Sequence, residues 1–331
     1  MNNFKKIGLT ALAASLVSVS ANAGAISVSG GASMNASGYS GEGQNRGATF
    51  TMGNQLTFSG SGELDNGLNV SVSFVIDQGD DTSNATGTAP FDSHSVTISS
   101  DTMGTLQLIG EGGSSASARI AGTAAGNLWD TFDQQTVAAG ATTIPDLSQT
   151  GTPGDDVFMY TTPAFMDGLT ATISWEPQNT GIDSGTGWGI DYTGVEGLTL
   201  QYAVTDVVGD TTLTSGDNTQ LKATYAYGPV TVGYSVGDHD EETTNGSGDI
   251  EMTSMAVTYT VSDELSITYG QETSEKGSAS TEDAEISAIS FAYTAGGMTL
   301  SGKMTEGENL DYTTDTAADL EAWTLGASFA F

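Results

Sequence analysis

Apolar and polar residues alternate with a period of two along most of this chain, and this alternation constrains the fold more than any other sequence feature. In residues 67–77 the large apolar side chains all share one parity, and the serines share the other. The pattern recurs in residues 197–206, 217–237, 250–273 and 319–331. A helix would repeat its apolar residues at intervals of three and four, so these segments are predicted to be β-strands.

The connections between these segments alternate between short turns and long polar stretches. Short turns lie at residues 65–66, 102–103, 195–196 and 263–264, whereas the longest polar stretch covers residues 112–154. Short turns on one rim and long loops on the other are typical of an outer-membrane barrel, whereas a soluble β-sandwich shares one core between two sheets. The sequence therefore predicts an all-β protein, a 16-stranded antiparallel transmembrane barrel. The predicted strands are 26–38, 53–64, 67–77, 93–101, 104–111, 155–162, 168–176, 186–194, 197–206, 217–227, 229–237, 250–262, 265–273, 284–295, 297–306 and 319–331.

The first 23 residues have the pattern of a cleaved signal peptide. Lys5 and Lys6 precede an apolar stretch, and Ala21 and Ala23 form a small-residue cleavage motif. An N-terminal anchor helix is the alternative, but the apolar stretch is short for a membrane span and contains several Ser and Thr residues. We therefore expect residues 1–23 to be removed and residues 24–331 to form the barrel.

The charge balance and the rare residue types exclude several functions. Asp and Glu number 41 against 7 Lys and Arg, so the chain is not expected to bind nucleic acid. It contains no cysteine and two histidines, which excludes thiolate sites and leaves little for catalysis or for a zinc site. His239 stands between Asp238 and Asp240, but no nucleophile motif accompanies it. The chain is predicted to be neither an enzyme nor a cofactor-binding protein.

The charges inside the predicted strands support a water-filled barrel. Glu63, Asp191, Lys222 and Lys303 all fall on the polar parity, which would face the lumen. A Lys or Arg facing lipid at mid-membrane costs about 2–4 kcal/mol, whereas water in a lumen tolerates the charge.

Four features, taken in their order along the chain, resemble those of the general porins of Gram-negative outer membranes, particularly the alphaproteobacterial type. They are NQLTFSGSGELDNGLNVSVSF at 54–74, DTMGTLQLIGE at 101–111, VFMYTTPAFMDGLTATISWEP at 157–177, and the terminal Phe331. The resemblance implies a homotrimer in outer-membrane lipid and lipopolysaccharide, through which small hydrophilic solutes diffuse passively. It also implies delivery by periplasmic chaperones and the barrel-assembly machinery, with Phe331 as the assembly signal, and an inward-folded loop at 112–154 that forms a constriction.

The constriction is predicted to be acidic. Asp130 and Asp133 are its candidate acids, because wall charges in a narrow pore lie within a Debye length of passing ions. The basic residues expected to oppose them across the pore are Arg119, Lys222 and Lys303; Asp191 and Glu63 are weaker lumen candidates. Each basic residue could instead neutralise a nearby acid.

Acidic clusters in the loops favour cations at the pore entrance. A solvated rim is the simplest interpretation of these clusters. They offer several carboxylate oxygens, so loose binding of divalent cations is the alternative, although none of them has the spacing of a calcium-binding loop. The sequence thus predicts a cation-preferring diffusion porin. The alternative is a surface-exposed structural or adhesin-type β protein, although no fixed-period repeat supports it.

Overall fold

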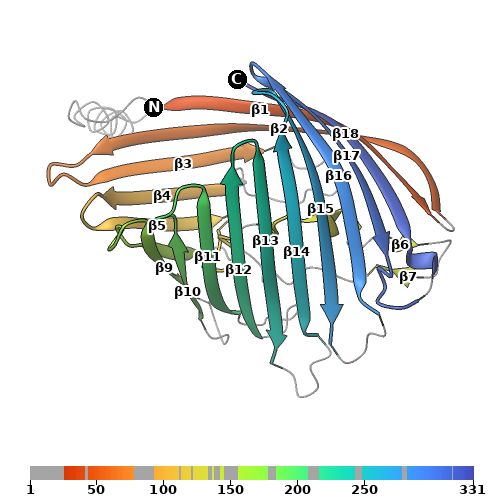
Figure 1. Ribbon diagram of the computed structural model, residues 1–331. Coiled ribbons are helices and arrows are strands. Elements are labelled where there is room, and N and C mark those ends of the chain that lie inside the picture. The colour runs from red at the N-terminus through yellow and green to blue at the C-terminus, as the bar shows by residue number, and fades with distance from the viewer. Residues whose placement is uncertain are drawn as a thin grey trace, which may run out of the picture.

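The computed structural model describes residues 26–41, 44–77, 93–111, 113–120, 122–132, 136–137, 142–144, 156–177, 184–207, 216–242, 248–277, 282–314 and 316–331. Sixteen of its strands form one closed antiparallel barrel, in which each pairs with its neighbours in the chain and β1 pairs with β18 (Figure 1). This confirms the predicted fold class. In the described part of the chain, no helix is both long enough and apolar enough to cross a membrane.

The elements have the following bounds. The barrel strands are β1 (Ser27–Gly41), β2 (Gln44–Glu63), β3 (Asn69–Asp77), β4 (Ser93–Ser100), β5 (Gly104–Glu111), β8 (Val157–Thr161), β9 (Leu169–Glu176), β10 (Gly185–Tyr192), β11 (Leu198–Val207), β12 (Gly216–Tyr227), β13 (Val230–Glu241), β14 (Ile250–Thr260), β15 (Leu265–Lys276), β16 (Ala284–Ala295), β17 (Met298–Glu308) and β18 (Leu320–Ala330). Between β5 and β8 lie the 3-10 helix η1 (Leu128–Thr131) and the short strands β6 (Thr136–Val137) and β7 (Thr142–Thr143), and η2 (Thr316–Ala318) precedes β18.

The strands differ most from the prediction at the long-loop rim. The sequence predicts a connection over residues 39–52, but β1 continues to Gly41, β2 begins at Gln44, and these two residues pair. Strand β13 likewise continues to Glu241, and β15 to Lys276. Above the membrane both faces of a strand can contact water, so a polar stretch there does not distinguish a strand from a loop.

The two faces of the barrel have opposite character. Val232, Val257 and Tyr269 stand opposite one another on β13, β14 and β15, and expose 43%, 48% and 48% of their surface on the outside. Lys222, on the alternate parity of β12, points inward as predicted and contacts a loop inside the barrel. Lipid therefore faces the apolar side of the sheet, and the lumen faces its polar side.

Acidic residues also occupy the outer face at the long-loop rim, which the parity argument did not anticipate. Asp238 stands opposite Glu251, and Glu251 opposite Glu275, on adjacent strands. Like charges directly opposite one another destabilise a sheet. These residues lie near the strand ends, where the cost of an outward-facing charge is lower than at mid-membrane. Parity therefore predicts the facing of charges only for the middle of each strand.

The two faces lead to a first prediction, tested on neighbouring residues. Val257→Lys puts an ammonium group into lipid and should lower the free energy of unfolding by about 2–4 kcal/mol. Thr258→Lys, one residue along the same strand, places the same charge in the lumen and should cost less than about 1 kcal/mol. Urea unfolding in lipid vesicles measures both, and equal losses would contradict the assignment of the two faces.

Candidate functional site

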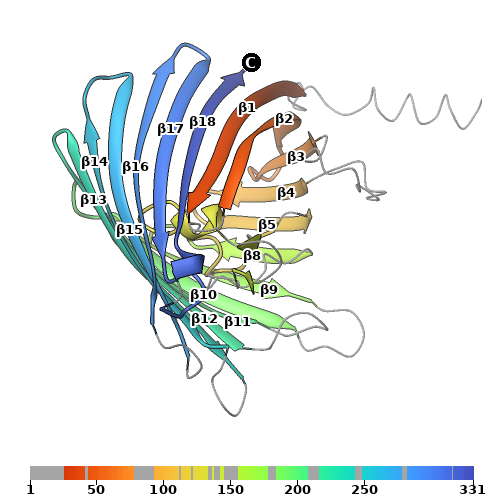
Figure 2. The same ribbon diagram turned by 90° about the vertical axis from the view of Figure 1, so that its right-hand side faces the viewer.

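Part of the predicted constriction loop lies inside the barrel. The yellow segment after β5 lies within the ring of strands (Figure 2). Ala116, Ile120 and Phe132 belong to this segment and are at most 3% exposed, although none of them is in the barrel sheet. The inward fold predicted for 112–154 is therefore confirmed for residues 113–120 and 122–132, which we call the inner loop.

Hydroxyl groups of the wall hold the backbone of the inner loop. Four loop N–H groups each donate to a Ser or Thr oxygen on a different strand. These bonds run from Ala116 to Ser174 (2.9 Å), from Ser117 to Thr205 (3.0 Å), from Ala124 to Ser235 (2.8 Å) and from Ala125 to Ser254 (2.9 Å). Because a buried N–H group needs an acceptor, these wall residues replace the water that the loop gave up.

Glycines of the wall let the loop approach closely. A Cβ atom at Gly270 of β15 would lie 2.7 Å from the Cβ of Ala125. At Gly187 of β10 it would lie 3.0 Å from the Cβ of Ala116. Small residues on both sides thus set the distance at which the hydroxyl contacts form.

Glu272 of β15 is the central anchor of the loop. Its side chain is 1% exposed, and one carboxylate oxygen accepts a hydrogen bond from the Thr123 hydroxyl. The other oxygen accepts from the backbone N–H of Trp129 (2.9 Å), at the start of η1, and the carboxylate also accepts from the N–H of Leu128. A carboxylate at the N-terminus of a helical turn satisfies N–H groups that have no partner within the turn.

Two lysines of the wall also bind the loop. Lys222 Nζ donates to the carbonyl oxygen of Gly122 (2.9 Å), and Lys303 Nζ donates to the Thr131 hydroxyl (2.9 Å). Lys303 further interacts electrostatically with Asp130 and Glu272. Both lysines therefore lie on the loop side of the lumen, which differs from the expectation that they face the loop acids across the pore.

Arg119 forms an ion pair with Asp191. Its guanidinium nitrogens lie 2.9 Å and 3.1 Å from the two carboxylate oxygens, a bidentate contact from the loop to β10. Gln201 of β11 donates to the same carboxylate (2.8 Å). Arg119 thus neutralises a wall acid, the alternative considered for the basic residues.

The remaining predicted residues are not all at the loop. Asp130 lies in η1 with its side chain exposed, whereas Asp133 lies outside the described residues. Glu63 ends β2 beside a short turn, opposite Asn69, and is not brought to the loop. His239 contacts the side chain of Asn218 (2.7 Å between His239 Nδ1 and Asn218 Oδ1). Within the described ranges, no three Asp, Glu or His side chains come together as metal ligands would.

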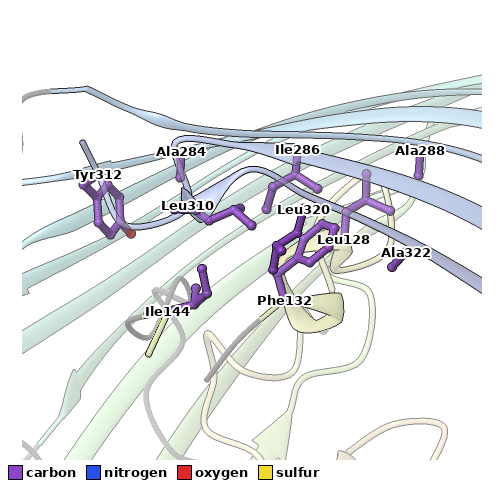
Figure 3. Close-up of a cluster of buried hydrophobic side chains, with 11 residues drawn as sticks. Leu128, Phe132, Ile144, Ala284, Ile286, Ala288, Leu310, Tyr312, Leu320 and Ala322 are labelled. Atoms are coloured by element: carbon purple, nitrogen blue, oxygen red, sulfur yellow. The ribbon is translucent and has the colours of Figure 1, made fainter. Parts of the chain in front are cut away.

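An apolar cluster inside the barrel completes the support of the loop (Figure 3). Leu128 and Phe132 of the loop pack with Ile286 of β16, Leu320 of β18 and Leu310 of the β17–β18 connection. Ile286 and Leu320 point inward although most lumen-facing residues are polar. The alternation of polar and apolar residues therefore did not predict that these two apolar side chains face the lumen. The sequence does contain a sign of this apolar cluster, because residues 284, 286 and 288, which all face the lumen, are apolar.

Phe331 extends the pairing of β1 with β18 by one residue pair. Phe331 N–H donates to the Gly30 carbonyl (3.0 Å), and Gly30 N–H donates to the Phe331 carbonyl (2.8 Å). The Phe331 side chain is 76% exposed on the barrel.

Comparisons with known proteins agree with this geometry. The family model described as Gram-negative porin matches residues 8–299. Similar solved structures include an anion-selective porin from Comamonas acidovorans, with a TM-score of 0.67, 15% identity, and coverage of 93% of this chain and 99% of that one. A triple mutant of the Rhodopseudomonas blastica porin has a TM-score of 0.63, 17% identity, and coverage of 93% and 100%. The Vibrio cholerae outer-membrane protein OmpT, with its loop L8 deleted, has a TM-score of 0.62, 14% identity, and coverage of 94% and 100%. No curated protein sequence matches the chain significantly.

The anchoring role of Glu272 can be tested against a neighbour on the same strand. Glu272→Ala leaves the N–H of Trp129 and the hydroxyl of Thr123 without their acceptor, and should lower stability by about 1–3 kcal/mol. The released loop should also increase the noise of the open-channel current. Glu275→Ala, on the outer face of β15, removes a like-charge pair with Glu251, so it should neither lower stability nor increase the current noise. Unfolding in vesicles and single-channel recording measure both effects, and identical behaviour of the two variants would refute the anchor.

Proposed function

This chain belongs to the Gram-negative porin family and forms a β-barrel channel in the outer membrane, and from that premise we propose that it is a passive, cation-preferring diffusion porin whose constriction is the inner loop. The observation that carries the proposal is the attachment of the loop to the wall. Contacts from β9 to β17 hold it inside the lumen, where it narrows the pore at a fixed place.

Some charges stay exposed after the inner loop has bound to the wall, and these charges support cation preference. Arg119, Lys222 and Lys303 each bind either a wall acid or loop oxygens, so their charges are partly compensated. Asp130 is exposed in η1, where it interacts electrostatically with Lys303. Wall charges act over about 8 Å at physiological ionic strength, which is comparable to the radius of a narrow pore. The excess of acids in the whole chain acts in the same direction.

The anion-selective relative does not decide the selectivity of this chain. At 15% identity it shares the fold, and ion selectivity depends on the individual charges along the pore. Asp133 is proposed as a second constriction acid on the basis of the sequence, and Asp191 and Glu63 as weaker contributors.

We further propose that the mature protein, residues 24–331, assembles as a homotrimer in lipopolysaccharide-containing membrane. The apolar outer stripes can contact either lipid or a second copy. Removal of residues 1–23, recognition of Phe331 by the assembly machinery, and loose binding of divalent cations at the acidic rim belong to the same proposal. None of these steps requires a cofactor.

Ion selectivity tests the central part of the proposal. In planar bilayers with a potassium chloride gradient, the reversal potential should show K⁺ passing several times more readily than Cl⁻. Asp130→Asn should reduce the permeability ratio by about twofold, because it removes a charge at the narrowest part. Asp263→Asn, in a short turn at the other rim, should leave the ratio nearly unchanged. A reversal potential that favours Cl⁻ would contradict cation preference.

Assembly is tested separately by electrophoresis. In mild detergent the unheated protein should migrate as a trimer, and boiling should convert it to a monomer. Deleting Phe331 should reduce the trimer recovered from outer membranes, with chains accumulating in the periplasm. Recovery of a water-soluble monomer without detergent would contradict the membrane assignment.

A further inference from the structure

Part of the inner face of β1–β4 differs from the wall that holds the loop. Ser27, Ser59, Ser73 and Ser95 stand directly opposite one another on four consecutive strands, which gives one row of hydroxyl groups across the wall. A second row, Ser61, Ser71 and Thr97, runs beside it toward the short-turn rim.

These two rows line a hollow of about 320 Å³. Its other lining residues are Gly60 and Val72, so no charged side chain contributes to it. All seven hydroxyl-bearing residues are at least partly exposed, in contrast to Ser174, Ser235 and Ser254, which the inner loop covers.

Most of the hydroxyl groups in the hollow are available to a solute. Ser27 and Ser59 share one hydrogen bond of 2.7 Å between their hydroxyl oxygens. Among the residues that the structure describes, the other five hydroxyl groups make no hydrogen bond to protein. Each serine or threonine hydroxyl can donate one hydrogen bond and accept two, so the hollow presents donors and acceptors together.

We propose that this hollow is a binding subsite for uncharged polyhydroxylated solutes, that is, sugars and sugar alcohols. The inference rests on the proposed channel function and adds a solute class to it. A polyol exchanges its hydrogen bonds to water for bonds to alternating donors and acceptors, which the two serine rows supply. A phosphorylated or carboxylated solute would find no cation in the hollow, and a metal ion would find no carboxylate.

The position of the hollow gives it a role in transport. Ser61 and Ser71 lie two residues from the strand ends Glu63 and Asn69, at the short-turn rim. Strand β1 contacts the inner loop at its other end, where the Tyr39 hydroxyl donates to the carbonyl oxygen of Thr131 (3.1 Å). A solute that has passed the inner loop therefore meets the hollow before it leaves the barrel. Weak binding there raises the local concentration of polyols without blocking the channel.

The test measures sorbitol binding through its effect on the potassium current of the purified protein in planar bilayers. Sorbitol should reduce the open-channel current saturably and add excess noise, beyond the effect of viscosity. The dimethyl ether of triethylene glycol, an uncharged solute without a hydroxyl group, should produce only the viscosity effect. The combined variant Ser27→Ala, Ser59→Ala, Ser73→Ala and Ser95→Ala should weaken sorbitol binding by about fivefold or more, which is the equivalent of one net hydrogen bond.

A matched control uses a second hydroxyl pair of the barrel. Thr258 and Thr268 of β14 and β15 lie 2.8 Å apart between their hydroxyl oxygens, and Thr258→Ala with Thr268→Ala should leave sorbitol binding unchanged. A non-saturable sorbitol effect in the wild type would overturn the subsite even if the serine variant failed to fold, and so would equal losses in the two variants. Absence of any potassium current in the wild type would instead overturn the proposed channel function, so the two failures are distinguishable.

Discussion

The requirement that every backbone N–H and C=O group in lipid be paired is the constraint on which this structure depends. Sixteen antiparallel strands meet it because β1 pairs with β18 and leaves no open edge. Once the sheet is closed, alternate residues must face lipid and water. The period of two in the sequence, the apolar outer stripe through Val232 and Val257, and the serine rows of the lumen all follow from that division.

The same requirement governs the inner loop, whose backbone has left water without joining the sheet. Hydroxyl groups of Ser174, Ser235 and Ser254, together with the carboxylate of Glu272, supply the missing acceptors. These residues of the lumen wall therefore hold the loop. The hollow on β1–β4 keeps most of its hydroxyl groups open, so the lumen is asymmetric: the constriction is held mainly by β9–β17, and the uncharged hollow lies on β1–β4.

Much of the barrel, but less of the site, could be predicted from the sequence. Parity and turn spacing are local, so they identified the strands and the inward facing of Lys222, Lys303 and Asp191. Parity also places Glu272 on the lumen side of the predicted strand 265–273, but nothing in the sequence shows that the loop covers its carboxylate. The pairing of Arg119 with Asp191 joins residues 72 positions apart and depends on how the loop folds. Extra strand length at the rim escaped prediction because water contacts both faces there.

The central claim is that the barrel has a lipid-facing and a water-filled side, and substituted-cysteine accessibility tests it most directly. The chain has no cysteine, so each introduced thiol is the only reactive one. Gln201→Cys should react with a membrane-impermeant thiol reagent and reduce the channel current, whereas Leu200→Cys, its neighbour on β11, should not react while the protein is in lipid. Equal reaction at both positions, or reaction at residue 200 alone, would contradict the account.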